Sequence, residues 1–521
     1  MSEHWDVVVV GAGIGGLSAA IDLAAQGHSV AVVEKSSAVG GKMRTIEIDG
    51  LPIDSGPTVL TMRDVFDDLF EHAGAKFDEE VDLQRMSILA RHAWTDGTRL
   101  DLHADPERSA VEIAQTFGEH DADGFRRFCE HTRRIHETVE VPFMRSDAPG
   151  LIGMVKQLSV KQMGRMVTVD FHRSMWKAIK SFFKDPRLHQ LFGRYATYYG
   201  SSPFEAPATL NVIAHVEQQG VWAVKGGMHS VAKAFAGLLR RLGGEVILDT
   251  AVEEIIVERG RVRGVRLAGG TTLHARTVVV NAAPEVVAAG RLGPSVAKAV
   301  SPARAPRSLS AITWSLVGKV PDFPLAFHNV LFSTDYPREF TELRAGQVPT
   351  EPTVYICAQD RDPTVVDQGL DPAPQRLFCL INAPARGDDD TFDLEIDQCR
   401  RRCFDLLARC GLTVEADPAQ MVCTTPHDFA RMFPGTGGAL YGPTTKGMTG
   451  AFSRPGARTK VGGLFMAGGG IHPGAGIPMV TMGGRLAARS AHADLGSTHR
   501  SLTGATYGGT STASATTGAK P

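Results

Sequence analysis

The feature that most constrains the fold is a strand, a glycine-rich turn and a helix near the start of the chain. Residues 7–27 read VVVVGAGIGGLSAAIDLAAQG. The continuous β-branched run in 5–10 predicts a parallel strand buried on both faces, because such strands have no polar side. The small and apolar residues of 14–26 predict a helix, and 29–33 (SVAVV) predicts a second strand. Together these segments predict one βαβ unit.

Four glycines at this turn, and an acidic residue after the second strand, predict a dinucleotide-binding site. Gly11, Gly13 and Gly16 have the spacing GxGxxG, and Gly15 lies inside the same turn. Such glycines allow a tight turn, a close approach of the backbone to a pyrophosphate and close packing of helix on strand. The amino end of the helix attracts the phosphates. Glu34 stands where a carboxylate accepts from a ribose hydroxyl and repels a 2′-phosphate, which argues against NADP.

Two later segments carry similar signals, so the nucleotide-binding fold is predicted to be discontinuous. Residues 245–284 predict a β-meander that ends in a buried strand (TVVVNA), and 461–491 predict a strand, a glycine loop and a helix. The expected fold class is α/β, or α+β over the whole chain, with other lobes inserted into a Rossmann-like domain. The expected divisions are 1–60, 221–290 and 450–496 for the nucleotide-binding domain, 61–220 for a mainly helical lobe facing substrate or membrane, 291–449 for a substrate-binding lobe, and 497–521 for a disordered tail.

Composition argues against several classes of protein. The formal net charge of −2 gives no general attraction for nucleic acid. The seven cysteines form no CxxC pair, and Cys399 and Cys403 are spaced to share a helix face, so no metal site is predicted. The chain has no apolar run of about 18 residues and no basic segment ahead of an apolar block, so neither a membrane span nor a signal peptide is predicted. We therefore expect a reduced, cytoplasmic protein.

One basic stretch leaves two interpretations open. Residues 151–190 hold an excess of basic over acidic side chains, interleaved with Trp176, Phe182 and Phe183. An amphipathic stretch of this kind can lie on an anionic membrane surface, which would place the protein peripherally on the inner face of the cell membrane. The alternative is a solvated helix face over an ordinary core. The basic residues are Lys156, Lys161, Arg165, Arg173, Lys177, Lys180, Lys184 and Arg187.

The segments that follow Glu34 carry a second motif. In 34–45 (EKSSAVGGKMRT) two glycines and the basic Lys42 and Arg44 come after the acidic residue, and 54–60 reads DSGPTVL. This arrangement resembles the extended FAD signature of glutathione-reductase-type flavoproteins, in their amine-oxidase and carotenoid-desaturase branch. The resemblance implies FAD as cofactor, with 40–44 beside the pyrophosphate and 54–60 near the flavin ring. For Arg44, a surface salt bridge is the alternative.

Three further blocks narrow the resemblance. They are 193–208 (GRYATYYGSSPFEAPA), 220–228 (GVWAVKGGM) and 472–478 (HPGAGIP). They are similar to the bacterial phytoene-desaturase-type carotenoid desaturases, and 327–340 and 352–363 look most like the hydroxyneurosporene (methoxyneurosporene) desaturases within that family. This resemblance implies an FAD-dependent oxidoreductase that introduces a C3–C4 double bond into a 1-hydroxy or 1-methoxy acyclic carotenoid by hydride transfer to flavin. The hydrophobic carotenoid is the implied partner, and the electron acceptor stays unidentified.

The resemblance implies cofactor contacts in all three pieces of the domain. The residues concerned are Gly11, Gly13, Gly15, Gly16, Glu34, Lys35, Gly41, Lys42, Arg44, Gly56, Pro57, Thr58, Val252, Gly468, Gly469, Ile477, Pro478 and Met479. Many relatives have aspartate at the position of Gly469, where it contacts the ribityl chain or the pyrophosphate. Glycine there implies that a backbone N–H replaces this contact or that the contact is missing, which leaves the tightness of FAD binding open.

No nucleophilic triad, metal cluster or carboxylate pair stands out in the sequence, which fits a reaction whose redox chemistry belongs to the cofactor. His472 is the first candidate for a protein acid or base, and a histidine that fixes its loop by hydrogen bonds is the alternative. Lys225 is a second candidate for the flavin neighbourhood. Tyr195, Tyr198 and Tyr199 either line a polyene tunnel or pack in the core.

Other functions remain as alternatives. A phytoene or neurosporene desaturase, or a redox-neutral carotenoid isomerase, would use the same scaffold, and product absorption separates them. A remote alternative is a prenyl-lipid-binding protein without catalysis, similar to the Rab GDP-dissociation inhibitors. The complete glycine set with Glu34 argues against it. An amine oxidase is disfavoured because the 472–478 block stands where that group has its own signature.

Overall fold

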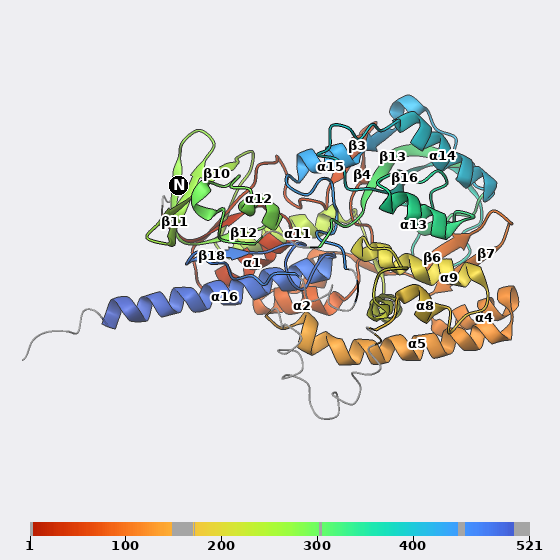
Figure 1. The fold of residues 1–521 in the computed structure, drawn as a ribbon, viewed down its shortest axis with the longest axis horizontal. Helices are drawn as coiled ribbons and strands as arrows, with labels where there is room; N and C mark the ends of the chain where they lie inside the picture. Colours follow the sequence, from red (N-terminus) through yellow and green to blue (C-terminus); the bar gives the residue numbers. More distant parts are fainter. Residues whose placement is uncertain are drawn as a thin grey trace, which may run out of the picture.

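The three separated pieces of the nucleotide-binding fold meet in one sheet. The structure is a computed structural model, and it describes residues 4–147, 170, 172–301, 305–445, 447 and 454–504. The first sheet has seven strands and lies in the left half of Figure 1. Its strands are β1 (His4–Val10), β2 (Val30–Val33), β9 (Glu245–Ile247), β10 (Val252–Glu258), β11 (Arg261–Leu267), β12 (Thr272–Val280) and β18 (Leu464–Met466).

Strand β1 is at the centre of this sheet. It pairs in parallel with β2 on one side and with β12 on the other, and β18 pairs in parallel with β12. The valines at 7–9 are completely buried, as a strand covered on both faces requires. Strands β10, β11 and β12 form the expected antiparallel meander. The predicted βαβ unit and the joining of its distant pieces are therefore confirmed.

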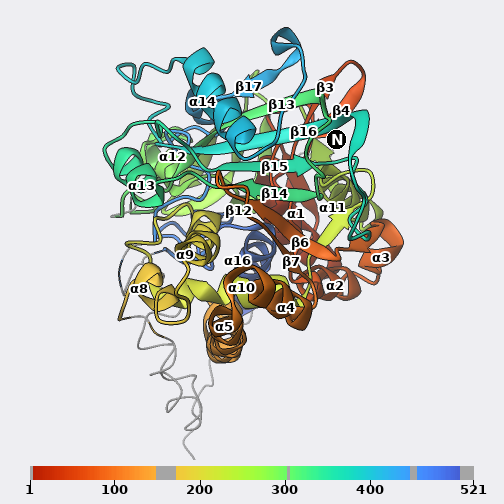
Figure 2. The ribbon, with the colours of Figure 1, turned by 90° about the vertical axis from the view of Figure 1, so that its right-hand side faces the viewer.

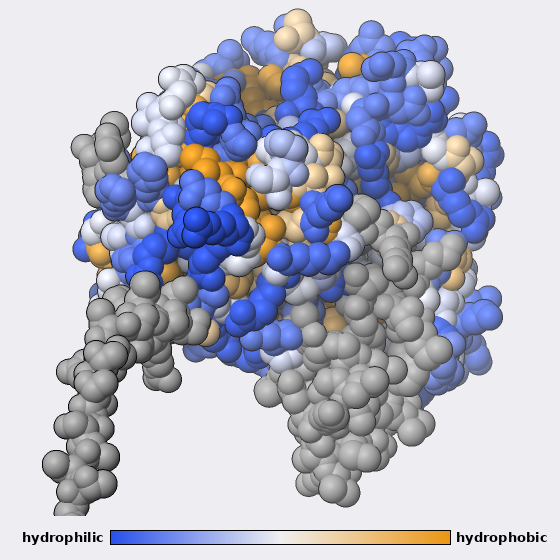
Figure 3. All heavy atoms as spheres, turned by 60° about the vertical axis from the view of Figure 1, so that its left-hand side comes forward, coloured by the Kyte–Doolittle hydropathy of each residue, from blue (hydrophilic) through white to orange (hydrophobic). Residues whose placement is uncertain are grey.

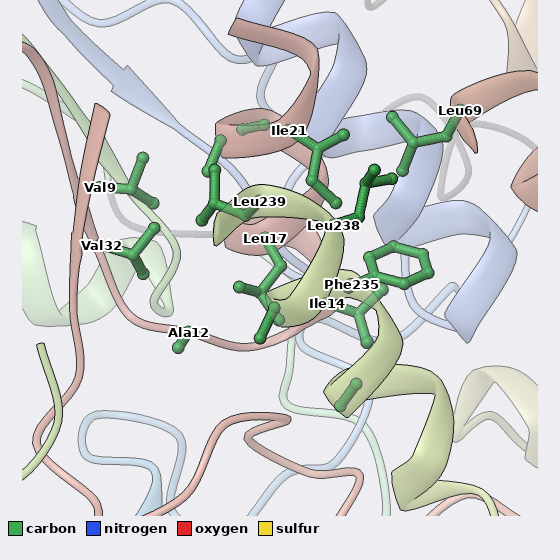
Figure 4. Packing of buried hydrophobic residues seen from close by; sticks show 14 of the residues in the cluster. Val9, Ala12, Ile14, Leu17, Ile21, Val32, Leu69, Phe235, Leu238 and Leu239 are labelled. Carbon is green, nitrogen blue, oxygen red and sulfur yellow. The ribbon is translucent and has the colours of Figure 1, made fainter. Parts of the chain in front are cut away.

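Helix α1 (Ile14–Ala25), which is rich in small residues, packs closely on this sheet. Helices α2 (Arg63–His72), α11 (His229–Arg241) and α16 (Ile477–Gly504) pack against α1, and α3 (Phe77–Glu80) packs against α2. Helix α12 (Pro284–Ala288) contributes Val287 to the core on the sheet. Figure 4 shows Leu17 and Ile21 of α1 in one buried cluster with Val9 of β1 and with Phe235 and Leu239 of α11. Since these side chains are almost fully buried, their contacts hold the glycine turn against a stiff core.

A second seven-stranded sheet forms the other half of the molecule, and Figure 2 shows its strands side by side. The order is β17-β13-β16-β15-β14-β6-β7. Its strands are β6 (Ile88–Ala93), β7 (Arg99–His103), β13 (Ser310–Val320), β14 (His328–Leu331), β15 (Val354–Ala358), β16 (Asp371–Ala383) and β17 (Val422–Thr424). Two short hairpin-like pairs complete the strands: β3 (Thr45–Ile48) with β4 (Leu51–Asp54), and β5 (Leu83–Arg85) with β8 (Trp222–Val224).

The expected separation into a helical lobe at 61–220 and a substrate lobe at 291–449 is wrong in one respect. Strands β6 and β7 come from the first of these segments, yet β6 pairs in parallel with β14 of the second. The two inserted segments therefore share a sheet. The sequence patterns of β6 and β7 are short and lie between helical segments, so they were not recognised as strands. The pairing of β6 with β14 depends on residues more than 200 positions away in the chain.

Apolar residues on the two faces of the second sheet belong to different cores. Ile356 and Leu377 face the cluster that includes α14, whereas Val330 and Phe332 face a cluster that includes α4, α5 and α9. The helices of this half are α4 (Pro106–Phe117), α5 (Glu119–Val139), the π-helical turn η1 (Glu140–Met144), α8 (Met175–Ile179), α9 (Pro186–Gly193), the 3₁₀ turns η3 (Arg194–Tyr199) and η4 (Ala208–Asn211), α10 (Val212–Gln219), α13 (Tyr336–Arg344), α14 (Ile396–Arg409) and α15 (Pro426–Met432). Two short turns, η5 (Pro294–Val296) and η6 (Pro418–Gln420), lie in the connections.

The tail begins later than expected. Helix α16 runs on to Gly504, past the predicted start of disorder at Ser497. The physical reason is that helical growth adds one backbone hydrogen bond per residue, so a helix packed along its first turns can extend into a weakly helical sequence. Residues 505–521 lie outside the described residues. Among the residues that the structure describes, no helix is long and apolar enough to cross a membrane.

The described part of the basic stretch (residues 170 and 172–190) has the arrangement of a solvated face over a core. Phe183 is buried and Phe182 and Trp176 pack partly against the same cluster, while Lys177, Lys180 and Lys184 are exposed. Lys156, Lys161 and Arg165 lie outside the described residues, so membrane contact by the whole stretch stays a hypothesis. On the face drawn in Figure 3, hydrophobic residues gather in a limited patch bordered by hydrophilic ones.

Candidate cofactor and substrate site

The glycine turn is built around Asn281, which follows β12. A Cβ added to Gly13 would lie 2.8 Å from Nδ2 of Asn281, and one added to Gly15 would lie 2.9 Å from its Oδ1. Gly11 has a φ of 99°, and an added Cβ would lie 2.9 Å from the carbonyl oxygen of Asn281. The side-chain amide of Asn281 donates to the carbonyl oxygen of Gly11. Side chains are thus excluded from the turn, and the backbone is left bare for a phosphate.

Glu34 lies at the end of β2 and braces this turn. One carboxylate oxygen accepts from the backbone N–H of Ala12 at 2.7 Å, and the other accepts from Ser36 at 3.0 Å. The chain after β9 passes beside it, because Thr250 donates its N–H to the carbonyl oxygen of Glu34. Val252 begins β10 two residues later and is half-buried. The acidic residue and Val252 therefore lie on the side of the turn where the sequence places a ribose.

The Gly-Gly-basic segment (residues 40–44) lies directly against the glycine turn (residues 11–16). The backbone N–H of Gly40 donates to the carbonyl oxygen of Ala12 at 2.8 Å, and a Cβ on Gly41 would lie 3.3 Å from Cα of Gly13. Gly56 is packed so tightly on the carbonyl oxygen of Lys42 that a Cβ there would overlap it. The segment 54–58, including the half-buried Pro57, thus follows the Gly-Gly-basic segment in space.

The three basic candidates differ in their surroundings. The Lys42 amine donates to the carbonyl oxygen of Leu440 and lies 5.3 Å from the centre of the Phe433 ring. Burial, with the nearby charge of Arg454, lowers the pKa of Lys42 to about 8. Arg44 donates to Thr424 at 3.0 Å rather than forming a surface salt bridge, and burial lowers its pKa.

Lys35 is the least suited of the three to hold a cofactor. Its amine donates to the backbone carbonyl oxygen of Met432 at 2.7 Å, in an exposed position. That contact ties the end of β2 to the last residue of α15. We expect Lys35 to position the end of this helix rather than contact a phosphate.

The third piece closes the turn from the other side. A Cβ on Gly468 would lie 2.8 Å from Oδ1 of Asn281, and Gly484 of α16 is packed on the carbonyl oxygen of Gly15. Gly469 is less confined, since an added Cβ would only touch Ala475 at 3.4 Å. The glycine that replaces aspartate is therefore not required by packing. Ile477, Pro478 and Met479 form the buried first turn of α16.

Arg454 was not singled out by sequence reasoning, yet it links the loops around this site. It is buried and donates to the carbonyl oxygens of Gly469, Tyr441 and Pro443. Burial lowers its pKa. A lone arginine in a loop carries no recognisable spacing, whereas Asn281 could have been found, because it directly follows the buried TVVV run at the end of a parallel strand.

His472 is buried and is used to hold its loop. Its Nε2 lies 2.9 Å from the carbonyl oxygen of Phe143 and 3.1 Å from that of Ser146, so this nitrogen is the donor. Burial lowers the pKa of His472. These contacts are the ones that the loop-fixing alternative requires. A catalytic role for His472 stays untested.

Lys225 does not lie in the buried site. Its side chain is 70% exposed and forms an ion pair with Asp82, with 3.3 Å between Nζ and the carboxylate oxygen. The VKGG segment turns sharply after β8, with positive φ at Gly226 and Gly227, and the lysine side chain is directed to solvent, so its place near the flavin stays a prediction. Lys225 instead stands on the rim of a surface cavity of about 360 Å³.

The tyrosines of the 193–208 block belong to a buried polar group. The hydroxyls of Tyr195 and Tyr198 donate to the two carboxylate oxygens of Glu217, at 2.6 and 2.8 Å. Arg194 donates to the Tyr198 hydroxyl at 3.3 Å. Burial raises the pKa of Glu217. Sequence analysis considered only the aromatic rings, and the polar partners supply a second reason for tyrosine rather than phenylalanine here.

A family match covers almost the whole chain. The model of the flavin containing amine oxidoreductase family matches residues 14–492. The chain belongs to this family. Its cofactor is therefore FAD, and it is an oxidoreductase. It is 47% identical over 519 residues to a hydroxyneurosporene desaturase of Rubrivivax gelatinosus, covering 98% of both chains. A protein of the same name from Cereibacter sphaeroides is 42% identical over 95% of this chain and 99% of its own.

More distant relatives and solved structures agree on the fold. A 4,4'-diapolycopene oxygenase of Methylomonas is 32% identical over 95% of this chain. An oxidoreductase structure from Methanosarcina mazei matches with a TM-score of 0.57 at 16% identity, covering 94% of this chain and 99% of that one. A putrescine oxidase structure matches with a TM-score of 0.56 at 17% identity, covering 95% and 99%. These likenesses show a mixed α/β fold of the flavin amine oxidase kind.

The residues of this chain fit FAD. The bare backbone around Asn281 suits a pyrophosphate, and Glu34, which follows β2, accepts from the backbone N–H of Ala12 in that turn. Lys42 is half-buried, and among the described residues its amine donates to the carbonyl oxygen of Leu440 and forms no ion pair with a carboxylate, which leaves its charge available to an anion. In the described part of the chain, no cluster of side chains is arranged to hold a metal ion. The expected grouping of Cys399 and Cys403 on one face of α14 is confirmed, and both are buried.

Proposed function

We propose that this chain desaturates the C3–C4 bond of 1-hydroxylated acyclic carotenoids in an FAD-dependent step of carotenoid biosynthesis. The observation that carries the proposal is the 47% identity over 98% of both chains to a protein named hydroxyneurosporene desaturase. The fold supports it, since the FAD site and the second sheet adjoin through segment 54–58 and β15. We also propose that the first sheet, with helices α1, α11, α12 and the first part of α16, is a glutathione-reductase-type FAD domain made of the segments 1–60, 221–290 and 450–496 that the sequence predicts.

The reaction removes a hydride from one carbon and a proton from its neighbour, and a C=C bond forms between them. FAD supplies the hydride acceptor when it is bound. The protein has to hold the cofactor with the glycine turn, Glu34 and Lys42, orient the polyene and exclude water. An allylic cation delocalised into the polyene makes the neighbouring proton acidic, so a strong protein base is not required. No residue is assigned to that proton here.

The test is anaerobic turnover of the FAD-loaded protein. 1-Hydroxyneurosporene is added, and absorbance and product mass are followed. The expected product absorbs at longer wavelength and is lighter by two hydrogens, while the flavin band bleaches. Desaturation of phytoene or neurosporene but not of the hydroxylated substrate would keep the family and overturn the member assignment. A product of unchanged mass would indicate an isomerase.

We also propose that the protein works at the cytoplasmic face of the cell membrane, because its substrate is insoluble in water. The exposed Lys177, Lys180 and Lys184 support contact with anionic headgroups. Co-sedimentation with vesicles containing anionic lipid is the measurement. Binding that is unchanged when the three lysines are replaced by glutamine would remove this basis.

A further inference from the structure

A chain of hydrogen bonds runs through the second sheet beside the FAD site. The Thr58 hydroxyl lies 2.6 Å from the Tyr355 hydroxyl, which lies 2.7 Å from Nδ1 of His328. Tyr355 is on β15 and His328 on β14, which are neighbouring strands in Figure 2. All three side chains are buried or nearly so. The chain links the segment expected beside the flavin ring to the interior of the substrate half.

The hydrogen-bond chain ends at Nε2 of His328, which has no hydrogen-bond partner among the described residues. Nε2 of His328 is buried and makes no hydrogen bond among the described residues, and the residue is only 3% exposed. Burial and the nearby charge of Arg194 lower the pKa of His328 to about 3, so the ring is neutral. Its free nitrogen is then a donor if Tyr355 donates to Nδ1, and an acceptor if Nδ1 carries the proton.

Arg194 adds a second unsatisfied group of the same kind. The residue is 9% exposed, and its Nε is buried without a hydrogen-bond partner among the described residues. Its guanidinium lies over the Tyr198 ring, 5.2 Å from the centroid. A buried donor left unpaired costs about 1–3 kcal/mol, so two such groups near one another need an explanation. A polar atom of a ligand would satisfy them.

A cavity adjoins this group. It has a volume of about 360 Å³, and Thr58, Phe327 and Cys357 form part of its wall. Thr58 bonds the Tyr355 hydroxyl, Phe327 precedes His328, and Cys357 is the register partner of His328 across the sheet. The cavity wall therefore includes neighbours of His328 along the chain and across the sheet, while His328, Tyr355 and Arg194 themselves do not line it.

We propose that His328 and Arg194, supported by Tyr355, bind the tertiary hydroxyl at the end of the carotenoid and so select hydroxylated over unmodified end groups. This inference rests on the proposed function. An alcohol both donates and accepts, so it can satisfy the free nitrogen of His328 in either tautomer and the N–H of Arg194. An unmodified hydrocarbon end would leave both groups buried and unpaired.

The placement suits oxidation of the C3–C4 bond. The hydroxyl is on C1, and C3 is only two carbon–carbon bonds away, each about 1.5 Å long. A group that binds the hydroxyl must therefore lie within one side chain of the flavin. Thr58 satisfies this condition, since it belongs to the segment expected beside the ring and touches Tyr355.

The experiment compares kcat/KM for 1-hydroxyneurosporene and for neurosporene in the FAD-loaded enzyme. The variants are Tyr355→Phe, His328→Leu and Arg194→Met, and the readout is the ratio of the two substrates. Each variant should lower the preference for the hydroxylated substrate by roughly 10-fold or more, because a site built for a hydroxyl rejects an analogue without it through its unpaired groups. Ser315→Ala removes a buried hydroxyl on β13 of the same sheet that has no hydrogen bond among the described residues, so it is the matched control and should leave the ratio unchanged.

Flavin absorbance and unfolding temperature confirm that each variant is folded and loaded. If His328→Leu fails to fold, the substrate ratio of Tyr355→Phe tests the inference, since this substitution removes only one oxygen atom. An unchanged ratio in the folded variants, with hydroxylated substrate still converted, would overturn the inference alone. Wild-type enzyme that converts neither substrate would overturn the proposed function and the inference with it.

Discussion

Replacing Gly16 by alanine tests whether close packing at the glycine turn is what creates the cofactor site. Gly16 lies in the first turn of α1, where alanine is normally favourable by about 1 kcal/mol. Here the added Cβ would lie 3.1 Å from Cβ of Asn281 and 3.2 Å from its Nδ2, and it would overlap the carbonyl oxygen of Gly11. A backbone atom cannot move aside as a flexible side chain does, so α1 must shift away from the turn.

The structure sets the expected size of the effect. Overpacking in a rigid core costs about 1–3 kcal/mol, which exceeds or cancels the gain in helix propensity. The shift also misplaces the N–H groups that bind pyrophosphate, and each such hydrogen bond to a charged group contributes about 1.5–3 kcal/mol. Loss of one corresponds to FAD affinity lower by roughly 10- to 100-fold. Titration of apoprotein with FAD, followed by flavin fluorescence, measures this directly.

The matched control is Gly496→Ala, which makes the same change in α16 where nothing lies within 4 Å of the added Cβ. It should leave FAD affinity unchanged and keep or raise the unfolding temperature. The reasoning is refuted if Gly16→Ala binds FAD as tightly as wild type and unfolds at the same or a higher temperature.

Three further predictions concern single side chains. Burial lowers the pKa of Lys42 to about 8, so its positive charge is present below that pH and lost above it. FAD affinity should therefore fall as the pH rises through about 8. The Lys42→Met variant should bind FAD more weakly, and its affinity should no longer depend on pH in this range when FAD is titrated at a series of pH values. His472→Gln keeps a neutral donor for the carbonyl oxygens of residues 143 and 146, so the pH profile of activity should match wild type, and a displaced profile would favour a proton-transfer role for the histidine. Lys225→Ala removes only an exposed ion pair, worth about 0–1 kcal/mol, so turnover and unfolding temperature should stay within error of wild type; a large loss of turnover would restore the lysine as a candidate.

The cofactor half was predictable because its signals are local. The valine run, the glycine spacing and the small residues of α1 each describe a short segment, and segments that need a bare backbone have few alternatives to glycine. The meeting of residues 40–44 with the Gly13 turn followed from the resemblance and agrees with the contacts found. The exposure of Lys225 was not predictable, because a lysine beside glycines looks the same in sequence whether the turn directs it inward or outward.

By itself, the sequence determined that a nucleotide lies at the strand–turn–helix unit, that the domain is discontinuous and that FAD fits it. Only the tertiary structure decided that β6 joins β14 in one sheet, that Arg454 links the loops of the site, and that His328 and Arg194 are buried with unpaired nitrogens. The physical reason is the separation along the chain between the residues that interact. A turn or a helix is specified by neighbours in the chain, whereas strand pairing and the satisfaction of buried polar groups depend on residues that only folding brings together.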